Sequence, residues 1–481
     1  MLGGSSGINA MLYLRGNDQD YQNWYNAGNK EWSVKEVKRC YKKLESLQNQ
    51  EMLSNSTISE HYGHDGPQVI NKFNHTLDRY IEKVLESWHE IGFRQVKDLN
   101  IENVMASARV TTTAANGIRQ STDRTYLLPA RKRSNLKILK SSLVTKILIE
   151  KNKAYGVEVD KDGKNLKFLS SREVIVSAGV LNSPQLLMLS GIGPAKALKK
   201  TNITSIVDSP RVGQNLQDHI IVPIFIYGDV PEESNTNDVM FDSINYIYKR
   251  QGSLTHSGVS SGGMALFSTL KNATFANCQN HLTLIPKNTT TLKDAYMSSF
   301  RYNETVAESI AAPNRDHGTF FIPFTILHPY SRGNLTLKTN NPKDAPLMYS
   351  NYFQDPRDLE TAVEGIKMTT KILNTTFFKS IGAFLGRIDI PSCNGFELDS
   401  KDYWKCISVQ VVTTIFHPVG TCSMGSNVKT SVVDSRLRVH GVKSLRVVDA
   451  SVMPTTISGN TNAAVIMIGE RGSELIIEDN K

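Results

Sequence analysis

The segment REVIVSAG, residues 172–179, predicts a short β-strand that is apolar on both faces and ends in small residues. Residues 182–191, NSPQLLMLSG, predict a helix directly after it, with Asn182 as the capping residue and Gly191 as the stop. Residues 445–451, LRVVDAS, repeat the design of the strand. Because a buried strand followed at once by a helix is typical of a doubly wound sheet, we expect an α/β domain with a ligand site at the carboxyl ends of these strands.

Further elements follow on both sides of this segment. Amphipathic helices are predicted near 34–44 and 76–92, strands at 136–139, 144–149 and 154–159, and a turn at 161–163. Residues 216–430 carry many strand-like pieces, including 318–323 and 334–338, and a helix around 358–374. This composition favours a second domain built on a mixed or antiparallel sheet with helices, so the expected class is α/β (α+β). A chain of 481 residues also exceeds what one core usually fills, so we expect two domains that interleave in sequence.

The distribution of charged and apolar residues argues against a nucleic-acid partner and against a membrane span. The chain has 55 basic and 46 acidic residues, a net charge of +9. The basic residues are spread throughout, and the densest cluster, Arg131 to Arg133, is too short for a nucleic-acid stripe. No apolar run reaches the roughly 18 to 20 residues that a membrane span needs. We therefore expect neither a nucleic-acid partner nor a membrane span.

Cysteine and asparagine patterns favour secretion. The five cysteines form no metal-binding pattern, and His61 and His64 stand without nearby cysteine ligands, so no metal site is expected. Cys393 and Cys406 flank a short loop and predict a disulfide, which requires an oxidising compartment. Eight glycosylation sequons begin at Asn55, Asn74, Asn202, Asn272, Asn288, Asn303, Asn334 and Asn374. We therefore expect an extracellular glycoprotein.

Several motifs together resemble one flavoprotein family. They are LGGSSGIN at 2–9, the segment 179–194, VGQNLQDH at 212–219, FHPVGTCSMG at 416–425 and VDAS at 448–451. In this combination the chain resembles glucose-methanol-choline (GMC) oxidoreductases over nearly its whole length, especially insect glucose-dehydrogenase-like members. The resemblance implies an FAD-binding domain from 1–30, 104–225 and 432–481, a helical lid at 31–103 and a substrate-binding domain at 226–431.

The resemblance also implies a reaction, the oxidation of the CH–OH group of a sugar or alcohol by hydride transfer to flavin N5. Such a reaction needs a proton acceptor and a second polar group that holds the oxygen. His417 matches the first position and Asn460 the second. By themselves, a histidine before a proline and an asparagine in a turn or helix cap would be unremarkable, and Asn460 can serve both as cap and as donor.

The resemblance assigns further residues to the FAD cofactor. Gly3 and Gly4 leave room for the cofactor, and Ser5 and Asn9 offer hydrogen bonds. Val144 is expected to contact adenine through its backbone, and Asp449 and Asn462 are expected at the ribityl or pyrophosphate region. A helix starting near Asn462 would direct its positive end toward the flavin.

One departure from the family pattern concerns the start of the chain. The strand, Gly-x-Gly-x-x-Gly turn and helix that open the family's cofactor domain have no counterpart here, and residues 1–6 form no signal peptide. We therefore expect an FAD-binding domain without its first βαβ unit, a fragment with reduced or no activity, whose full-length form is secreted. The alternative is a non-catalytic secreted binding or decoy protein. We expect a dehydrogenase that passes electrons to a quinone or another acceptor, although the sequence leaves an oxidase open.

Overall fold

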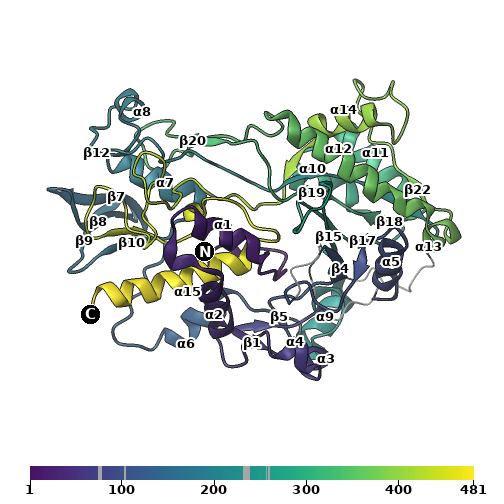
Figure 1. The fold of residues 1–481 in the computed structure, drawn as a ribbon, viewed down its shortest axis with the longest axis horizontal. Coiled ribbons are helices and arrows are strands. Elements are labelled where there is room, and N and C mark those ends of the chain that lie inside the picture. Colours follow the sequence, from purple (N-terminus) through teal and green to yellow (C-terminus); the bar gives the residue numbers. More distant parts are fainter. Residues whose placement is uncertain (74–77, 102–104, 231–238, 256, 258–259) are drawn as a thin grey trace.

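A computed structural model describes residues 1–481 except 74–77, 102–104, 231–238, 256 and 258–259. Figure 1 shows two parts side by side: β7 to β10 with α7 and α15 on the left, and the sheets around β15 to β19 with α10 to α14 on the right. The chain passes between the parts several times.

The first part contains the two strands predicted at 172–176 and 445–447. β10 (Val174–Val176) pairs in parallel with β24 (Leu445–Val447), and Val174 lies opposite Leu445. Beside them lies an antiparallel sheet of β7 (Leu143–Glu150), β8 (Lys153–Lys161) and β9 (Lys164–Leu169). The predicted turn at 161–163 joins β8 to β9, and its residues Asp162 and Gly163 have positive φ. The strand predicted at 136–139 is wrong, because this exposed segment makes no ladder with another strand among the described residues.

The helix after β10 begins earlier than predicted. α7 (Gly179–Leu189) starts at Gly179, so Asn182 is no cap and Pro184 lies inside the helix. Proline has no N–H to donate to the carbonyl four residues earlier. The Thr421 hydroxyl donates to that carbonyl, on Val180, at 2.6 Å. This tertiary hydrogen bond allows the helix to run through Pro184.

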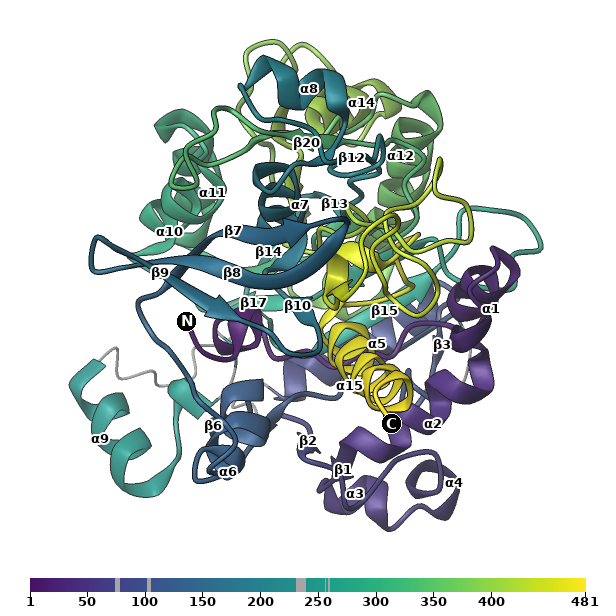
Figure 2. The same ribbon diagram turned by 90° about the vertical axis from the view of Figure 1, so that its left-hand side faces the viewer.

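Helices from both ends of the chain complete the first part. α15 (Asn462–Asp479) packs beside α2 (Val34–Leu44), and Figure 2 shows the two helices next to one another below β10. α1 (Asp18–Asn26) lies close to α2 and contributes Trp24 to the same buried cluster. The helix predicted at 34–44 is confirmed.

The second part is built on two sheets. The larger runs in the order β23 (Thr413–Thr414), β13 (Ile220–Val222), β19 (Phe324–Ile326), β16 (Cys278–His281), β15 (Gly263–Phe267), β4 (Ala106–Arg109) and β3 (Arg94–Gln95). The smaller runs in the order β17 (Thr283–Ile285), β18 (Gly318–Phe321), β14 (Phe225–Gly228) and β22 (Phe384–Leu385). Every pairing is antiparallel except that of β3 with β4, so the predicted mixed sheet is confirmed.

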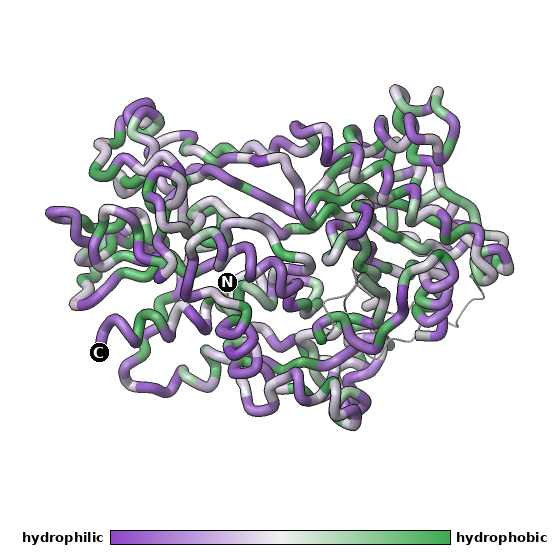
Figure 3. The backbone as a smooth tube through the Cα atoms, viewed as in Figure 1, coloured by the Kyte–Doolittle hydropathy of each residue, from purple (hydrophilic) through white to green (hydrophobic). Residues whose placement is uncertain are grey.

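The seven-stranded sheet separates two cores. One face, which includes Ala265 and Phe324, packs with α5 (Asp78–Glu90) and α12 (Pro356–Thr370). The other face, which includes Met264 and Leu266, packs against residues 11–14. Figure 3 shows hydrophobic segments running through this sheet region. Of the helix predicted at 76–92, residues 76 and 77 lie outside the described residues.

The remaining elements border these cores. They are α3 (Gln50–Leu53), α4 (Ser56–Ser59), α6 (Leu128–Ala130), α8 (Ala195–Lys200), α9 (Val239–Lys249), α10 (Leu292–Phe300), α11 (Glu304–Asn314), α13 (Thr376–Ser380) and α14 (Lys401–Val411), with the strand pairs β1 (Glu45–Leu47) and β2 (Gln68–Ile70), β5 (Ala114–Ala115) and β6 (Ile118–Arg119), β11 (Ile192–Gly193) and β12 (Val207–Asp208), and β20 (Asn334–Thr336) and β21 (Leu347–Tyr349). α5, which belongs to the predicted lid, packs into the same core as the large sheet. The domain boundaries stay a prediction. None of the helices in the described ranges has the length and apolarity needed to cross a bilayer.

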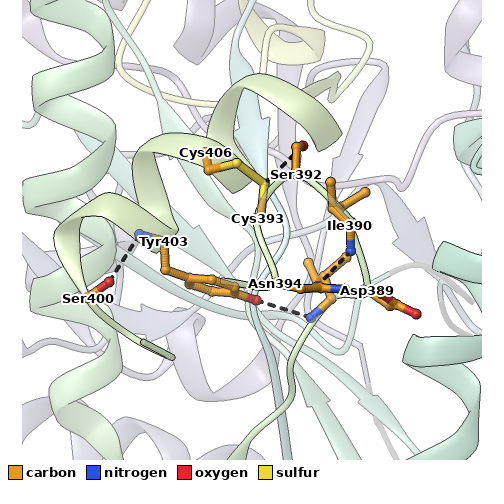
Figure 4. The surroundings of a disulfide bond; sticks show 9 residues. Asp389, Ile390, Ser392, Cys393, Asn394, Ser400, Tyr403 and Cys406 are labelled. Atoms are coloured by element: carbon orange, nitrogen blue, oxygen red, sulfur yellow. Dashed lines mark hydrogen bonds between the residues drawn. A yellow bond between two sulfur atoms is a disulfide. The ribbon is translucent and has the colours of Figure 1, made fainter. Parts of the chain in front are cut away.

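The predicted disulfide between Cys393 and Cys406 is present, with a Cα to Cα distance of 5.6 Å. Figure 4 shows it joining α14 to the loop before it. The same loop is held by the Tyr403 hydroxyl, which accepts from the backbone N–H of Ile388 at 3.1 Å. The crosslink therefore fixes α14 to the loop between β22 and α14.

Candidate active site

His417 is buried and held on its backbone side. It follows β23, and its backbone N–H donates to Oδ1 of Asp218 at 3.0 Å. The Tyr352 hydroxyl donates to the other oxygen of the same carboxylate at 2.5 Å. The carboxylate thus ties His417 to Tyr352, and the loop carrying His417 has little freedom to turn its ring away.

Asn460 lies directly beside the imidazole of His417. Its Nδ2 is 3.2 Å from His417 Nε2, and its Oδ1 accepts from Nε2 of Gln279 at 3.5 Å. An amide nitrogen can only donate, so His417 Nε2 is the acceptor of this pair. The structure therefore brings together the two residues to which the sequence assigned the chemistry.

A second imidazole contacts the other nitrogen of the His417 ring. His219 Nδ1 lies 2.9 Å from His417 Nδ1, and the two rings meet edge to face. Since Nε2 of His417 accepts from Asn460, its proton is on Nδ1 and is donated to His219. This arrangement holds His417 in the tautomer whose Nε2 lone pair faces Asn460.

Burial keeps these histidines uncharged. It lowers the pKa of His417 to about 3, and repulsion between the protonated forms of His417 and His281 makes a smaller contribution in the same direction. Burial likewise lowers the pKa of His281 to about 4 and places the pKa of His219 well below its usual range. In the described residues, no cluster of His, Cys, Asp and Glu side chains is arranged to hold a metal ion. Neutral imidazoles can accept protons, so His417 suits general-base chemistry.

Asn462 and Asp449 differ in their hydrogen-bond partners. Asn462 is the first residue of α15, and its Nδ2 is buried with no hydrogen-bond partner in the described part of the chain. Asp449 instead accepts from the Gly179 N–H at 2.9 Å, the Ser183 hydroxyl at 2.5 Å and the Ser451 N–H at 2.8 Å. Its carboxylate joins the end of β10 to the segment after β24, and its predicted contact with FAD stays a prediction.

The residues of the opening turn are placed as follows. Gly3 and Gly4 have positive φ, and the short helix Gly4–Gly7 contains Ser5, which is exposed. Arg119 donates to the side-chain oxygen of Asn9 at 2.8 Å, so Asn9 has a structural partner. Val144 lies in β7 opposite Val159, next to an irregularity in the pairing. The roles of these four residues and of Val144 toward a cofactor stay predictions.

Three features of the first part fit a flavin nucleotide. A Cβ added at Gly4 or Gly179 would meet no heavy atom within 4 Å, so the backbone there is open to a close ligand. The N-terminus of α15, an 18-residue helix, attracts negative charge. The buried amide of Asn462 at the same helix end offers an unused donor. A flavin nucleotide has an anionic diphosphate, which the helix N-terminus attracts, and a ring system whose polar atoms form hydrogen bonds.

Comparison with known proteins decides the family. Residues 1–221 and 329–469 match the N-terminal and C-terminal regions described as GMC oxidoreductase. The chain belongs to the GMC oxidoreductase family. Membership identifies it as an oxidoreductase with FAD as its cofactor and confirms the resemblance drawn from the motifs.

Individual GMC relatives cover almost the whole chain. A glucose dehydrogenase [FAD, quinone] of Drosophila pseudoobscura pseudoobscura is 36% identical over 482 residues, which are 99% of this chain and 73% of the relative. An ecdysone oxidase of Spodoptera littoralis is 34% identical over 477 residues, 99% of this chain and 78% of the relative. A solved FAD-dependent oxidoreductase of Chaetomium thermophilum superimposes with a TM-score of 0.81 at 24% identity, covering 99% of this chain and 86% of that one. The GMC fold, a cofactor domain with a substrate domain, is thus shown.

Three further site residues were not singled out from the sequence. His219 lay within the quoted motif 212–219, so its position could have been weighed as a partner for His417. Gln279 and His281 come from β16, whose sequence CQNH lacks the apolar pattern of a core strand. Only the pairing of β16 into the centre of the sheet places Gln279 beside Asn460 and His281 on the same face of the sheet.

Proposed function

We propose that this GMC oxidoreductase oxidises the CH–OH group of a sugar or another alcohol, with His417 as proton acceptor and Asn460 as the donor that orients the substrate oxygen. The observation that carries the proposal is the 3.2 Å contact between Asn460 Nδ2 and His417 Nε2, both buried. It places one acceptor and one donor side by side, as alcohol oxidation requires.

Each residue of the proposed site has its own role in the reaction. His417, neutral because burial lowers its pKa to about 3, takes the hydroxyl proton on Nε2 when the substrate hydroxyl replaces Asn460 as the donor to that nitrogen. The amide of Asn460 then donates to the substrate oxygen instead of to Nε2, and His219 accepts from Nδ1 of His417 and keeps its ring oriented. Asn462 and the start of α15 hold the cofactor. FAD, when bound, supplies the two-electron acceptor.

We further propose a dehydrogenase that uses a quinone or a similar acceptor, as the name of the Drosophila relative suggests. Secretion is also proposed. The side chains of Asn202, Asn272, Asn288, Asn303 and Asn374 are exposed, as glycan acceptors must be, and the disulfide suits an oxidising compartment.

The test is anaerobic mixing of the FAD-loaded protein with a panel of sugars and alcohols while the flavin absorbance is followed. Bleaching by at least one of them is expected. The reduced protein is then mixed with a soluble quinone or with oxygen, and faster recovery with the quinone is expected. A flavin that no sugar or alcohol bleaches would overturn the proposed function, and faster recovery with oxygen would overturn the choice of acceptor.

A further inference from the structure

The hydroxyl group of Ser458 lies between two side chains from different parts of the molecule. It donates to Oδ1 of Asp20 at 3.0 Å, and it lies 2.9 Å from Nε2 of His328. The same Nε2 is 3.5 Å from Oδ1 of Asp20. Asp20 belongs to α1 of the first part, and His328 follows β19 of the second part. Ser458 is therefore held from both parts at once.

The directions of these hydrogen bonds place a hydrogen on Nε2 of His328. A serine hydroxyl has one proton, and Ser458 donates it to the carboxylate of Asp20, whose ionised form can only accept. The hydroxyl oxygen therefore accepts from Nε2 of His328. His417 has the opposite arrangement, with its hydrogen on Nδ1. The two imidazoles thus have different roles, because His328 donates through Nε2 whereas His417 accepts through it.

The loop that carries Asn460 is held at the position of Ser458. Ser458 precedes Asn460 by two residues, so the bonds of Ser458 restrict where the amide of Asn460 lies. A second bond joins the same two segments, since the Thr456 hydroxyl donates at 2.7 Å to the backbone oxygen of Leu327, the residue before His328. The segment after β19 therefore contacts the Asn460 loop at two points.

His328 can be changed without leaving a buried charge unpaired. Ser458 is 3% exposed and Asp20 is 2% exposed, so water has little access to replace a lost partner of either. The side chain of His328 is 24% exposed. Asp20 also accepts from the backbone N–H groups of Asn17 and Ser458. Replacing His328 therefore removes one hydrogen bond to Ser458 while the carboxylate keeps its other donors.

We propose that His328 is a positioning residue for Asn460. Its Nε2–H holds the hydroxyl of Ser458, and through this bond the second part of the molecule sets where the Asn460 amide lies relative to His417. The inference rests on the proposed function and deepens it. A shift of the amide changes the direction in which it donates to the substrate oxygen, and hydrogen bonds weaken steeply when they are misaligned. His328 thus acts on the reaction without touching the substrate.

The experiment is a double-mutant cycle on the limiting rate of flavin reduction, measured by single-turnover mixing of the FAD-loaded protein with the sugar or alcohol that reduces it fastest. His328→Leu should lower this rate on the order of tenfold, the effect of about one hydrogen bond. In an Asn460→Ala background the same change should lower it less than about twofold, because the amide that His328 positions is gone. His328→Gln, whose amide can donate in place of Nε2, should restore most of the rate.

A second pair of histidine and serine provides the matched control. Nε2 of His440 lies 3.0 Å from the hydroxyl of Ser431, and His440 is half-buried as His328 is. The Ser431 hydroxyl donates to backbone oxygens within residues 425–427, not to the loop that carries Asn460. His440→Leu should therefore lower the free energy of unfolding in urea about as much as His328→Leu does, and it should leave the rate of flavin reduction unchanged.

The outcomes separate the inference from the function on which it rests. An equal fall in rate for His328→Leu in both backgrounds would overturn the inference and leave the proposed function standing. So would a His328→Gln variant as slow as His328→Leu, or a His440→Leu variant that is equally slow. If no sugar or alcohol reduced the flavin of the unmodified protein, the proposed function would fail and the inference with it.

Discussion

Asp20 and Ser458, 438 positions apart in sequence, are joined by two hydrogen bonds to one buried carboxylate. The Ser458 N–H donates to Oδ2 of Asp20 at 2.7 Å, and its hydroxyl donates to Oδ1 at 3.0 Å. The same carboxylate caps α1 by accepting from the N–H of Asn17. The first helix of the chain therefore anchors the loop that carries Asn460.

Asp20→Asn should lower both stability and turnover. The amide keeps one acceptor and introduces donors where the carboxylate accepted, so we expect a loss of about 1–3 kcal/mol in the free energy of unfolding, measured with urea. Flavin reduction should slow as well, because Asn460 is less firmly placed. Asp18→Asn on the surface of the same helix, where Asp18 pairs with Lys38, should cost less than about 0.5 kcal/mol. Equal losses in the two variants would contradict the anchoring role.

His417→Ala should abolish most of the reaction while FAD stays bound. Removing the proton acceptor is expected to slow flavin reduction by on the order of a hundredfold or more. FAD content, measured by absorbance after protein precipitation, should not change. His64→Ala, at an exposed histidine, should leave the rate as it was. A His417 variant with normal turnover would remove this residue from the mechanism.

His219 is expected to act as a positioning residue through His417. His219→Leu removes the acceptor for the Nδ1–H of His417, and we expect a fall in kcat of about tenfold with little change in KM. His219→Gln offers a side-chain oxygen to the same N–H and should restore most of the rate. If Gln and Leu had the same effect, the hydrogen bond between the two imidazoles would not matter for turnover.

Stability should fall in acid as histidines become protonated. The pKa of His281 in the folded protein is about 4 and that of His417 about 3, both below the usual value of about 6.5 for an unfolded chain. Between these values the unfolded chain binds more protons, so the free energy of unfolding decreases as pH falls from about 6.5 to about 4. Each such histidine contributes a slope of up to about 1.4 kcal/mol per pH unit.

The acid effect can be assigned with a variant. Burial raises the pKa of Asp20 and of Asp218, and protonation of these carboxyl groups in the folded protein opposes the trend at the acid end. The comparison is therefore made between His281→Leu and the unmodified protein by urea unfolding at pH 7 and pH 5. A shallower dependence in the variant is expected, and parallel curves would show that His281 is not the source.

Local patterns were sufficient for the elements whose signal is contained within them. The short strands at 174–176 and 445–447 and the amphipathic helix at 34–44 follow from side-chain patterns, which depend only on neighbouring residues. The helix after 172–179 was predicted to begin at Asn182, and it begins at Gly179 because Thr421 supplies the hydrogen bond that Pro184 cannot. No local pattern contains that donor, since it is 241 residues from its acceptor.

The sequence alone determined the family, the cofactor and the two residues proposed for the chemistry, because motifs such as 416–425 keep their residue types at consecutive positions. Only the tertiary structure decided what surrounds His417: His219 on one nitrogen, Asn460 on the other, and Gln279 beside the amide of Asn460. The physical reason is that strand pairing and burial act between residues far apart in sequence. Which polar atoms are left without partners is known only when the chain has folded.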